Sequence, residues 1–401
     1  MNILFVTDTD ISPISGGVER VVYVLSYYLT AKYNVCCHLA YTDKSKVVTN
    51  DNVFVSKYEI KHDDGIENMK QYMEEANIDI VFSNMMRGSS LSRIMPVLGN
   101  VSQQLNITHI ATFHNMPSYE LVGMNLSILV SRIFHGNKIG SLLQLGKQIV
   151  VSLLGRKLAT HFLHKKYRCT YDNVDKLYLL DENYIPIYSS CANVCISDKF
   201  GFMPNALPFQ YTKAFEDIDQ KEKIVLIVSR LEEKQKRLSV AFKIWKQVER
   251  SGDFPDWKLV VVGSGEDETI YRKMLKKMNM KNVKMVGCQE SLPYYQRASI
   301  FMMTSAYEGF PMVLVEAQQM GVVPIAFDSF SAVNSVLSNN KTGVIVPNND
   351  ELSYLNSLTE TMRNVGFRRK MAVACICASE AYSLEKIAHR WMNIFESVSK
   401  K

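Results

Sequence analysis

Two glutamates with seven residues between them, Glu308 and Glu316, flank the stretch of this chain whose residue types are best suited to chemistry. Gly309 and Pro311 bend the chain just before an apolar-periodic segment that begins at Met312. The first amides of a helix that starts there lack intrahelical partners and can bind a phosphate. Carboxylates accept hydrogen bonds from hydroxyl groups. Both glutamates can therefore border one pocket for a small ligand that carries phosphate and sugar hydroxyls.

This stretch lies between a predicted strand and a predicted helix. The apolar run Ile300–Met303 indicates a buried strand, and apolar residues recur at helical spacing after Pro311. A strand that leads through a polar loop into a helix is typical of a parallel α/β sheet. The alternative interpretation is an ordinary strand, turn and helix with two solvated glutamates.

A second charged loop follows the apolar run 223–228, which predicts another strand. Arg230 comes soon after that run, and the basic segment Lys234-Gln235-Lys236-Arg237 precedes helical spacing from Ala241. The alternative to a functional role is a basic loop that is merely solvated.

Polar residues also end the strands predicted in the first half of the chain. The run 1–6 leads into a loop with Gly16 and Gly17, where a helix begins, and a glycine pair there allows close backbone approach and free amides. His114 follows the predicted strand 109–113. Open α/β sheets bind ligands at the edge formed by the carboxyl ends of their strands. His114 is therefore a candidate, although a hydrogen-bonded structural histidine is the alternative.

Length and composition limit the class of protein. The 401 residues, of which 47% are apolar and 21% charged, suit two globular α/β domains of about 200 residues each. Eight cysteines without zinc-ligand spacing indicate reduced thiols in a cytosolic protein. The longest apolar stretches, 121–130 and 149–154, fall short of the roughly 20 residues of a membrane span, and the first residues lack a signal peptide's features. The net charge of +6 is modest, and we expect no nucleic-acid partner.

The run Tyr307–Ala317, with Gly-Phe-Pro between its two glutamates, resembles the signature of the retaining family-4 glycosyltransferases, the glycosyl transferases group 1. The segment Gly321–Ile325 after the helix is also similar to this family. The resemblance is strongest from Arg230 to Pro347 and weaker before it. It implies the GT-B architecture, in which two Rossmann-like domains face each other across a cleft and a last helix crosses back to the first domain.

Domain boundaries follow from this resemblance. We expect an acceptor-binding domain at 1–205, a linker at 206–222, a nucleotide-sugar-binding domain at 223–381 and a final helix at 382–401.

The resemblance also implies roles for the candidate residues. Arg230 and a lysine would hold the donor diphosphate, and of Lys234 and Lys236 we choose Lys236 because it lies nearest the following helix. Glu316 would bind the donor ribose and Glu308 the donor sugar. His114 would line the cleft and contact the transferred sugar, although the sequence does not identify a catalytic base. The remaining expected donor-binding positions are Gly16, Gly17, Cys288, Gly309, Phe310, Met312, Val313 and Leu314.

The activity implied is transfer of a hexose-type residue, with retention, from a nucleotide sugar to a hydroxyl of a glycan or polyprenyl-linked acceptor in surface polysaccharide biosynthesis. Uridine is the family's commonest base. No metal or other cofactor is expected, because Arg230 and Lys236 do what a divalent ion would do. The alternatives are another enzyme of the same fold, such as a nucleotide-sugar epimerase or a phosphorylase, and a non-catalytic sugar-nucleotide binding protein.

The segment 121–168 departs from the α/β pattern, since no Asp or Glu occurs between Glu120 and Asp172 while apolar and basic residues alternate. Helices that lie in the headgroup region of a membrane have this composition. We therefore expect this segment to contact the cytoplasmic face of a membrane. Ordinary core helices with a solvated basic face are the alternative.

Overall fold

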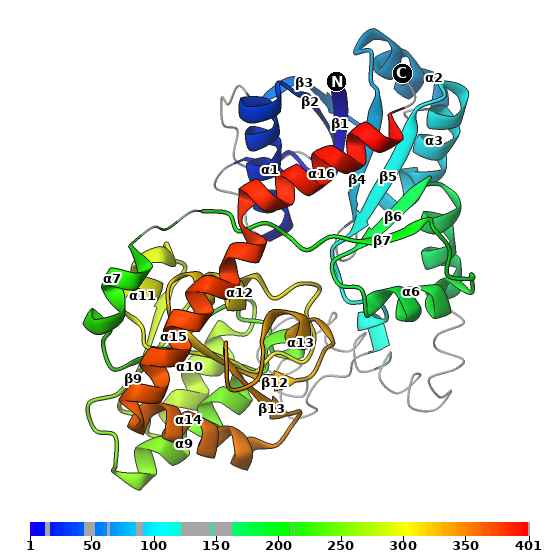
Figure 1. The fold of residues 1–401 in the computed structure, drawn as a ribbon. Coiled ribbons are helices and arrows are strands. Elements are labelled where there is room, and N and C mark those ends of the chain that lie inside the picture. The colour runs from blue at the N-terminus through cyan, green and yellow to red at the C-terminus, as the bar shows by residue number, and fades with distance from the viewer. Residues whose placement is uncertain are drawn as a thin grey trace. The chain divides into compact units, whose positions relative to one another are not determined.

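The computed structural model describes residues 1–12, 17–43, 53–61, 65–85, 91–121, 146, 163–209, 211 and 213–399. The chain forms two compact units, coloured along the sequence in Figure 1. The first unit contains residues 1–118, 160–210 and 382–401, and the second contains 119–159 and 211–381.

The first unit is built on a seven-stranded parallel sheet in the order β3-β2-β1-β4-β5-β6-β7. Its inner strands are nearly continuous apolar runs, as expected where helices cover both faces of a parallel sheet. The strands are β1 Asn2–Thr9, β2 Cys36–Asp43, β3 Phe54–Glu59, β4 Ile80–Met85, β5 Thr108–Phe113, β6 Lys176–Leu179 and β7 Phe200–Phe202. The helices are α1 Gly17–Tyr33, α2 Ile66–Glu75, α3 Leu91–Gln104, a helix over 163–172, α6 Tyr184–Ala192 and α16 Leu384–Val398.

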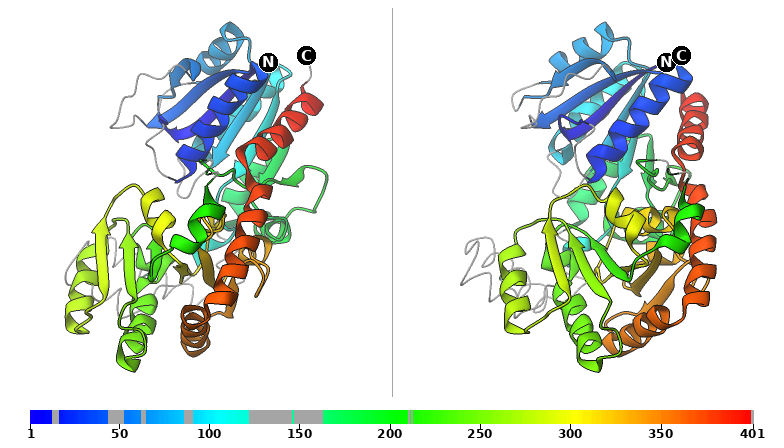
Figure 2. Two further views of the ribbon diagram at one scale, coloured as in Figure 1. Left: turned by 60° about the vertical axis from the view of Figure 1, so that its left-hand side comes forward. Right: turned by 90° about the vertical axis from the view of Figure 1, so that its left-hand side faces the viewer.

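The last helix, α16, packs on this first sheet. Trp391 lies 4.7 Å from Phe82 of β4 and stacks on Phe395 at 5.5 Å between ring centroids. Near its end, the Val398 carbonyl accepts a hydrogen bond from the Thr108 hydroxyl at 2.7 Å. Figures 1 and 2 show α16 in red along this sheet. The prediction that the final helix returns to the first domain is therefore confirmed.

The second unit has a six-stranded parallel sheet in the order β10-β9-β8-β11-β12-β13. Its strands are β8 Ile224–Val228, β9 Lys258–Val262, β10 Val283–Gly287, β11 Ile300–Met303, β12 Val323–Asp328 and β13 Val344–Pro347. Its helices include α7 Ala214–Asp217, α8 Glu233–Lys236, α9 Leu238–Ser251, α10 Glu268–Lys277, α11 Leu292–Arg297, α12 Met312–Gln319, α13 Ala332–Val336, α14 Glu351–Arg363 and α15 Val365–Ser379. Short 3-10 helices occupy Tyr119–Leu121, Ile218–Gln220 and Glu380–Tyr382.

Helix α9 shows how the second core forms from the apolar pattern of the sequence. Leu238, Phe242 and Trp245 recur at helical spacing and are all buried in the core beneath β8 and β9. The apolar spacing from Ala241 thus predicted the helix correctly. The highly charged loop expected before it instead contains the short helix α8, which is followed by Arg237 in the left-handed conformation, with φ of 49°.

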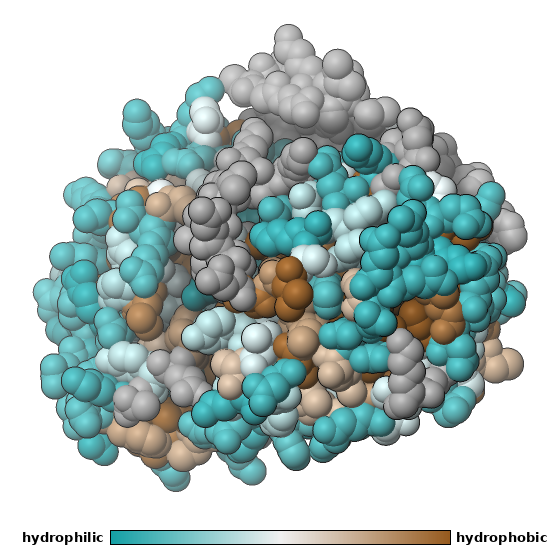
Figure 3. All heavy atoms as spheres, turned by 90° about the horizontal axis from the view of Figure 1, so that it is seen from above, coloured by the Kyte–Doolittle hydropathy of each residue, from teal (hydrophilic) through white to brown (hydrophobic). Residues whose placement is uncertain are grey.

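Among the described residues, no helix is both long enough and apolar enough to cross a membrane. In the view of Figure 3, apolar side chains on the described surface occur in several separate areas among polar ones. Most of the segment 121–168 lies outside the described residues, so its predicted membrane contact rests on sequence.

Candidate functional site

The second sheet reverses its strand order between β8 and β11, which are hydrogen-bonded neighbours with connections leading in opposite directions. The carboxyl ends of strands at such a reversal form the usual ligand crevice of an open α/β sheet. Arg230 follows β8 and Glu308 follows β11. The order of the strands therefore brings these two predicted residues to the same edge.

Glu308 is bound on both of its carboxylate oxygens. Lys236 Nζ lies 2.6 Å from Oε1, and Gln235 Nε2 donates to Oε2 at 2.8 Å. The Lys236 and Glu308 side chains are only 12% and 9% exposed. The alternatives of a solvated glutamate and a solvated basic loop are therefore wrong for these two residues, which form a largely buried ion pair.

Arg230 joins the same cluster through Gln235. Its Nη2 donates to Gln235 Oε1 at 3.1 Å, while the residue as a whole is exposed. Arg230, Gln235, Glu308 and Lys236 thus form one connected group, which we call the charged cluster. Lys234, the other candidate lysine, is half-buried.

Helix α8 is held in place by buried polar contacts of Glu233. The Glu233 carboxylate accepts hydrogen bonds from the Tyr271 hydroxyl at 2.8 Å and from the Ser239 backbone amide at 3.2 Å. The Glu233 backbone amide donates to Asp267 Oδ2 at 2.7 Å. Burial raises the pKa of Glu233, against the opposing effect of these donors. These contacts fix the backbone from which Gln235 and Lys236 project.

Arg237 connects α8 to the loop after β11. Its Nε donates to the Thr304 carbonyl at 2.7 Å and its Nη2 donates to the Ser305 carbonyl at 2.9 Å. We predicted no role for Arg237, Gln235 or Glu233. The one available signal was an amide set among charged residues directly before a helix.

The turn after β9 supports the Arg230 loop from the other side. Gly263 has φ of +136°, and a Cβ there would lie 1.9 Å from the Ser229 carbonyl oxygen. A Cβ on Gly265 would lie 2.5 Å from the Leu231 carbonyl oxygen. The glycines therefore allow close packing of two backbone segments.

Helix α12 carries the second glutamate. Glu316 is buried, and Tyr295 Oη donates to its Oε2 at 3.0 Å. Tyr295 is fully buried and its ring stacks near Phe301, with centroids 5.8 Å apart. Tyr295 is therefore a core residue whose hydroxyl orients Glu316.

The start of α12 differs from the expectation that its first amides lack partners. The Met312 amide donates to the Phe310 carbonyl at 2.9 Å, and the Leu314 amide donates to the Pro311 carbonyl at 2.9 Å. These two amides are thus occupied within the turn. Val313 lines a small cavity of about 10 Å³ together with Lys236, Ser229, Thr304 and Ser305, which places the helix start beside the charged cluster.

The other predicted donor-binding residues lie as follows. Gly309 is half-buried and Phe310 is buried in the turn before α12. Cys288 is exposed directly after β10, the edge strand two positions away from β8. Gly17 is the first residue of α1, with φ of +60°, and Gly16 lies outside the described residues.

His114 belongs to the first unit and follows β5. Its Nε2 lies 3.2 Å from Asn84 Oδ1 at the end of β4, and its Nδ1 is buried without a hydrogen-bond partner among the described residues. Burial lowers the pKa of His114 to about 3, against a smaller opposing effect of Asn205. The imidazole is therefore neutral at neutral pH and suited to hydrogen bonding with an uncharged group.

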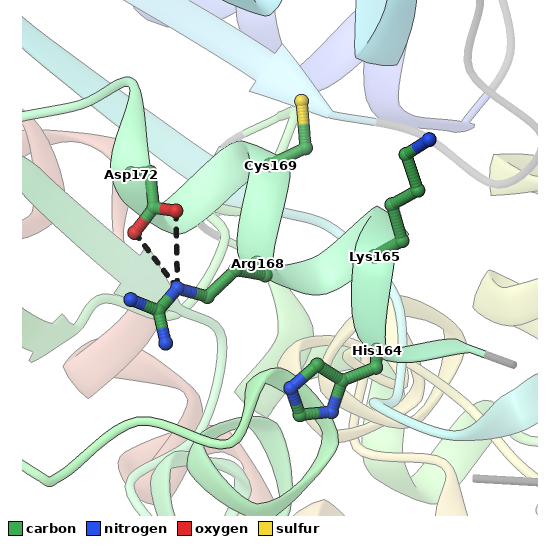
Figure 4. A pocket seen from close by; sticks show the side chains of 5 residues that line it. All are labelled: His164, Lys165, Arg168, Cys169 and Asp172. Carbon is green, nitrogen blue, oxygen red and sulfur yellow. Dashed lines mark hydrogen bonds and ion pairs between the residues drawn. The ribbon is translucent and has the colours of Figure 1, made fainter. Parts of the chain in front are cut away.

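A larger cavity of about 460 Å³ lies along the helix 163–172 of the first unit, and Figure 4 shows its lining. Arg168 Nε donates to both carboxylate oxygens of Asp172 at 3.0 Å. None of the predicted donor-site residues lines this cavity. Within the described ranges, no group of three His, Cys, Asp or Glu residues is placed to hold a metal ion.

Comparison with known proteins finds that the second unit resembles a known family. Residues 209–374 match the family model of the glycosyl transferases group 1. The amylovoran biosynthesis glycosyltransferase AmsD of Erwinia amylovora is 29% identical over 53% of this chain and 59% of its own length. A UDP-Gal:alpha-D-GlcNAc-diphosphoundecaprenol alpha-1,3-galactosyltransferase of Escherichia coli is 25% identical over 43% of this chain and 49% of its own length. The chain thus spans about half the length of these curated relatives.

Solved structures resemble the whole chain. Anabaena HepE in complex with UDP has a TM-score of 0.73 at 13% identity and covers 99% of this chain and 100% of its own. The lipopolysaccharide outer core galactosyltransferase WaaB has a TM-score of 0.66 at 14% identity and covers 99% of both chains. At these identities the likeness shows the fold. The predicted GT-B class, with two Rossmann-like domains, is confirmed.

Proposed function

We propose, from the match of residues 209–374 to the family model of the glycosyl transferases group 1, that this chain is a glycosyltransferase. It transfers a hexose-type residue from a nucleotide sugar to a hydroxyl of a glycan or lipid-linked acceptor. The Escherichia coli relative is named for UDP-Gal and a diphosphoundecaprenol-linked acceptor, and the Erwinia relative for amylovoran biosynthesis. These names support a UDP-sugar donor and a place in surface polysaccharide biosynthesis.

The charged cluster is the observation that carries this proposal. When a nucleotide sugar gives up its sugar, negative charge develops on the departing diphosphate, and cations fixed at that position lower the barrier. Arg230 offers an exposed guanidinium, and Lys236 has a compact ammonium with three donors, of which Glu308 takes one. The pair with Glu308 holds the ammonium in place before the donor arrives.

Metal independence and retention are further parts of the proposal. Arg230 and Lys236 supply positive charge where other transferases use a divalent ion, so no metal is required. Retention of the anomeric configuration follows from the resemblance of the Glu308 to Glu316 stretch. Proton NMR of the first product formed distinguishes an α from a β linkage.

We assign hydrogen bonding, and not proton abstraction, to His114. A neutral imidazole whose pKa is held near 3 by burial is a weak base at neutral pH. Its buried Nδ1 can donate a hydrogen bond to a sugar hydroxyl or accept one from it, depending on the tautomer. The resemblance likewise implies that His114 contacts the transferred sugar.

The membrane contact of 121–168 remains part of the proposal, with the protein at the cytoplasmic face of the inner membrane. Each basic residue near an anionic surface contributes on the order of 1 kcal/mol. Vesicle flotation tests it: the protein should float with anionic liposomes at low salt and be released as salt rises. Changing Arg156, Lys157, Lys165, Lys166 and Arg168 to Gln should abolish flotation, and equal flotation of this variant would contradict the contact.

The activity is tested with a panel of UDP, GDP and ADP sugars. A matching donor at about 100 times its dissociation constant should raise the free energy of unfolding by roughly 2.7 kcal/mol, seen as a higher melting temperature. Nucleotide release then reports turnover, and product analysis without an acceptor separates transfer from epimerisation. Absence of both stabilisation and nucleotide release across the panel would contradict the proposal.

A further inference from the structure

We propose that Gln235 is a positioning residue of the donor site, which fixes Arg230 and Glu308 relative to each other. The inference rests on the proposed function, because it gives these two residues their role. The Gln235 amide oxygen accepts from Arg230 Nη2 at 3.1 Å, and the amide nitrogen donates to Glu308 Oε2 at 2.8 Å. One side chain thus bridges the loop after β8 and the loop after β11.

The orientation of this amide is determined by its surroundings. Nε2 also approaches the Tyr307 carbonyl at 3.3 Å, so the nitrogen faces two acceptors while the oxygen faces a cation. Gln235 is 7% exposed, and its own carbonyl accepts from the Ala306 amide at 2.7 Å. Side chain and backbone therefore both tie α8 to the segment that carries Glu308.

An amide is the side chain that fits this bridge. It accepts from a guanidinium at one atom and donates to a carboxylate at another, and it stays neutral at every physiological pH. An ionised glutamate could accept from Arg230 but could not donate to Glu308. A lysine could donate to Glu308 but could not accept from Arg230.

The bridge has a consequence for the ion pair beneath it. Lys236 occupies Oε1 of Glu308, and Gln235 occupies Oε2. The carboxylate cannot turn without breaking a charge-assisted hydrogen bond. Gln235 therefore restrains the guanidinium of Arg230 relative to the Glu308 carboxylate that holds Lys236, and such preorganisation favours the binding of one diphosphate by two cations.

Replacing Gln235 with glutamate tests this role by pH. In Gln235→Glu two carboxyl groups stand within hydrogen-bonding distance, so one of them retains a proton to a higher pH than usual. The protonated carboxyl can donate to Glu308 as the amide does. Relative to wild type, nucleotide release from a UDP-sugar should be close to normal near pH 5 and about ten- to hundredfold slower near pH 8, the size of one lost hydrogen bond to a charged group.

Gln318 provides the matched control, because it is a buried amide of the same unit whose partners are uncharged. Its nitrogen donates to the Val336 and Thr342 carbonyls at 3.1 and 3.0 Å. Gln318→Glu should lower the melting temperature. Its rate divided by the wild-type rate should be the same near pH 5 and near pH 8. Gln235→Leu should lower kcat at all pH values while far-UV circular dichroism stays unchanged.

Two failures can be told apart. If wild type uses a nucleotide sugar but Gln235→Glu follows the wild-type pH profile, or folded Gln235→Leu keeps the wild-type kcat, then Gln235 does not position the site. If wild type neither binds nor consumes any nucleotide sugar, the proposed function fails and this inference fails with it.

Discussion

In the second unit the side chains of the charged cluster are bonded to one another and in part open to solvent, whereas in the first unit His114 is buried, neutral and paired with an amide. Lys236 and Glu308 are 2.6 Å apart, and Arg230 is linked to them through Gln235. His114 meets Asn84 at the end of a parallel strand, and burial holds its pKa near 3. The same edge of two similar sheets thus offers fixed charge in one unit and uncharged hydrogen bonding in the other.

This difference suits two kinds of ligand group. Fixed cations bind a diphosphate and stabilise the charge that develops as it departs. A neutral imidazole can donate a hydrogen bond to a hydroxyl group or accept one from it without carrying charge. The predictions below test whether the contrast is functional.

The largest effect is expected at the cations of the charged cluster. Arg230→Ala and Lys236→Ala should each lower kcat by about 10² or more, as when one stabilising donor is lost from a site of developing charge. Nucleotide release measured on folded protein gives the rate. Lys234→Ala is the control and should have a small effect. A damaging Lys234→Ala beside a near-normal Lys236→Ala would transfer the diphosphate role to Lys234.

The two glutamates should separate binding from rate. Tyr295 orients Glu316, which the resemblance assigns to the donor ribose. Glu316→Ala should therefore weaken UDP binding by about ten- to hundredfold, the range of one hydrogen bond to a charged group. Glu308→Ala should mainly lower kcat, because it releases Lys236. Isothermal titration with UDP distinguishes them, and equal losses of affinity would contradict the assignment.

The neutral state of His114 predicts a pH dependence of stability. An unfolded histidine has its ordinary pKa of 6.5, so as pH falls the unfolded state binds the proton first and the free energy of unfolding decreases. From pH 7 to pH 5 the loss due to His114 should be about 2 kcal/mol. Urea unfolding of wild type and His114→Gln measures it.

His109 provides a control for this comparison. Burial also lowers its pKa, to about 4, and Ser83 Oγ lies 2.8 Å from its Nε2. Its contribution stays in both proteins and cancels in their difference. Identical pH slopes for wild type and His114→Gln would show that His114 is not held neutral by the fold.

The smallest effect is expected from chelation. EDTA should leave nucleotide release unchanged, because Arg230 and Lys236 provide the positive charge. Manganese added back serves as the control. Activity that disappears in EDTA and returns with manganese would show that the charged cluster alone is insufficient.

Apolar periodicity predicted the strands and the longer helices well. It did not predict elements that are held by polar contacts. Strands such as β8 and β11 are continuous apolar runs, and α9 buries Phe242 and Trp245 at helical spacing. These signals are local in sequence. The segment 232–237, expected as a loop, forms α8 because Glu233 and Arg237 find buried partners elsewhere in the fold.

The sequence pointed to Glu308 and Lys236 as candidate residues but did not predict the contact between them. Glu308 and Lys236 are 72 positions apart in the chain, and their ion pair depends on how β8 and β11 neighbour each other. The contacts of Gln235 were not predicted, because an amide among charged residues before a helix does not reveal which groups it will contact. The low pKa of His114 likewise depends on desolvation by distant residues, which no local spacing reveals.

The glycine turn after β9 has a consequence for efforts to alter the proposed donor site by mutation. Gly263 and Gly265 touch the backbone of Ser229 and Leu231 so closely that any side chain added there displaces the segment bearing Arg230. Cys288, by contrast, is exposed, and a Cβ on the neighbouring Gly287 would meet no atom within 4 Å, although its φ of +79° strains other residues. Substitutions meant to alter the proposed donor site are therefore better tolerated at Cys288, a predicted donor-binding position, than in the β9 turn.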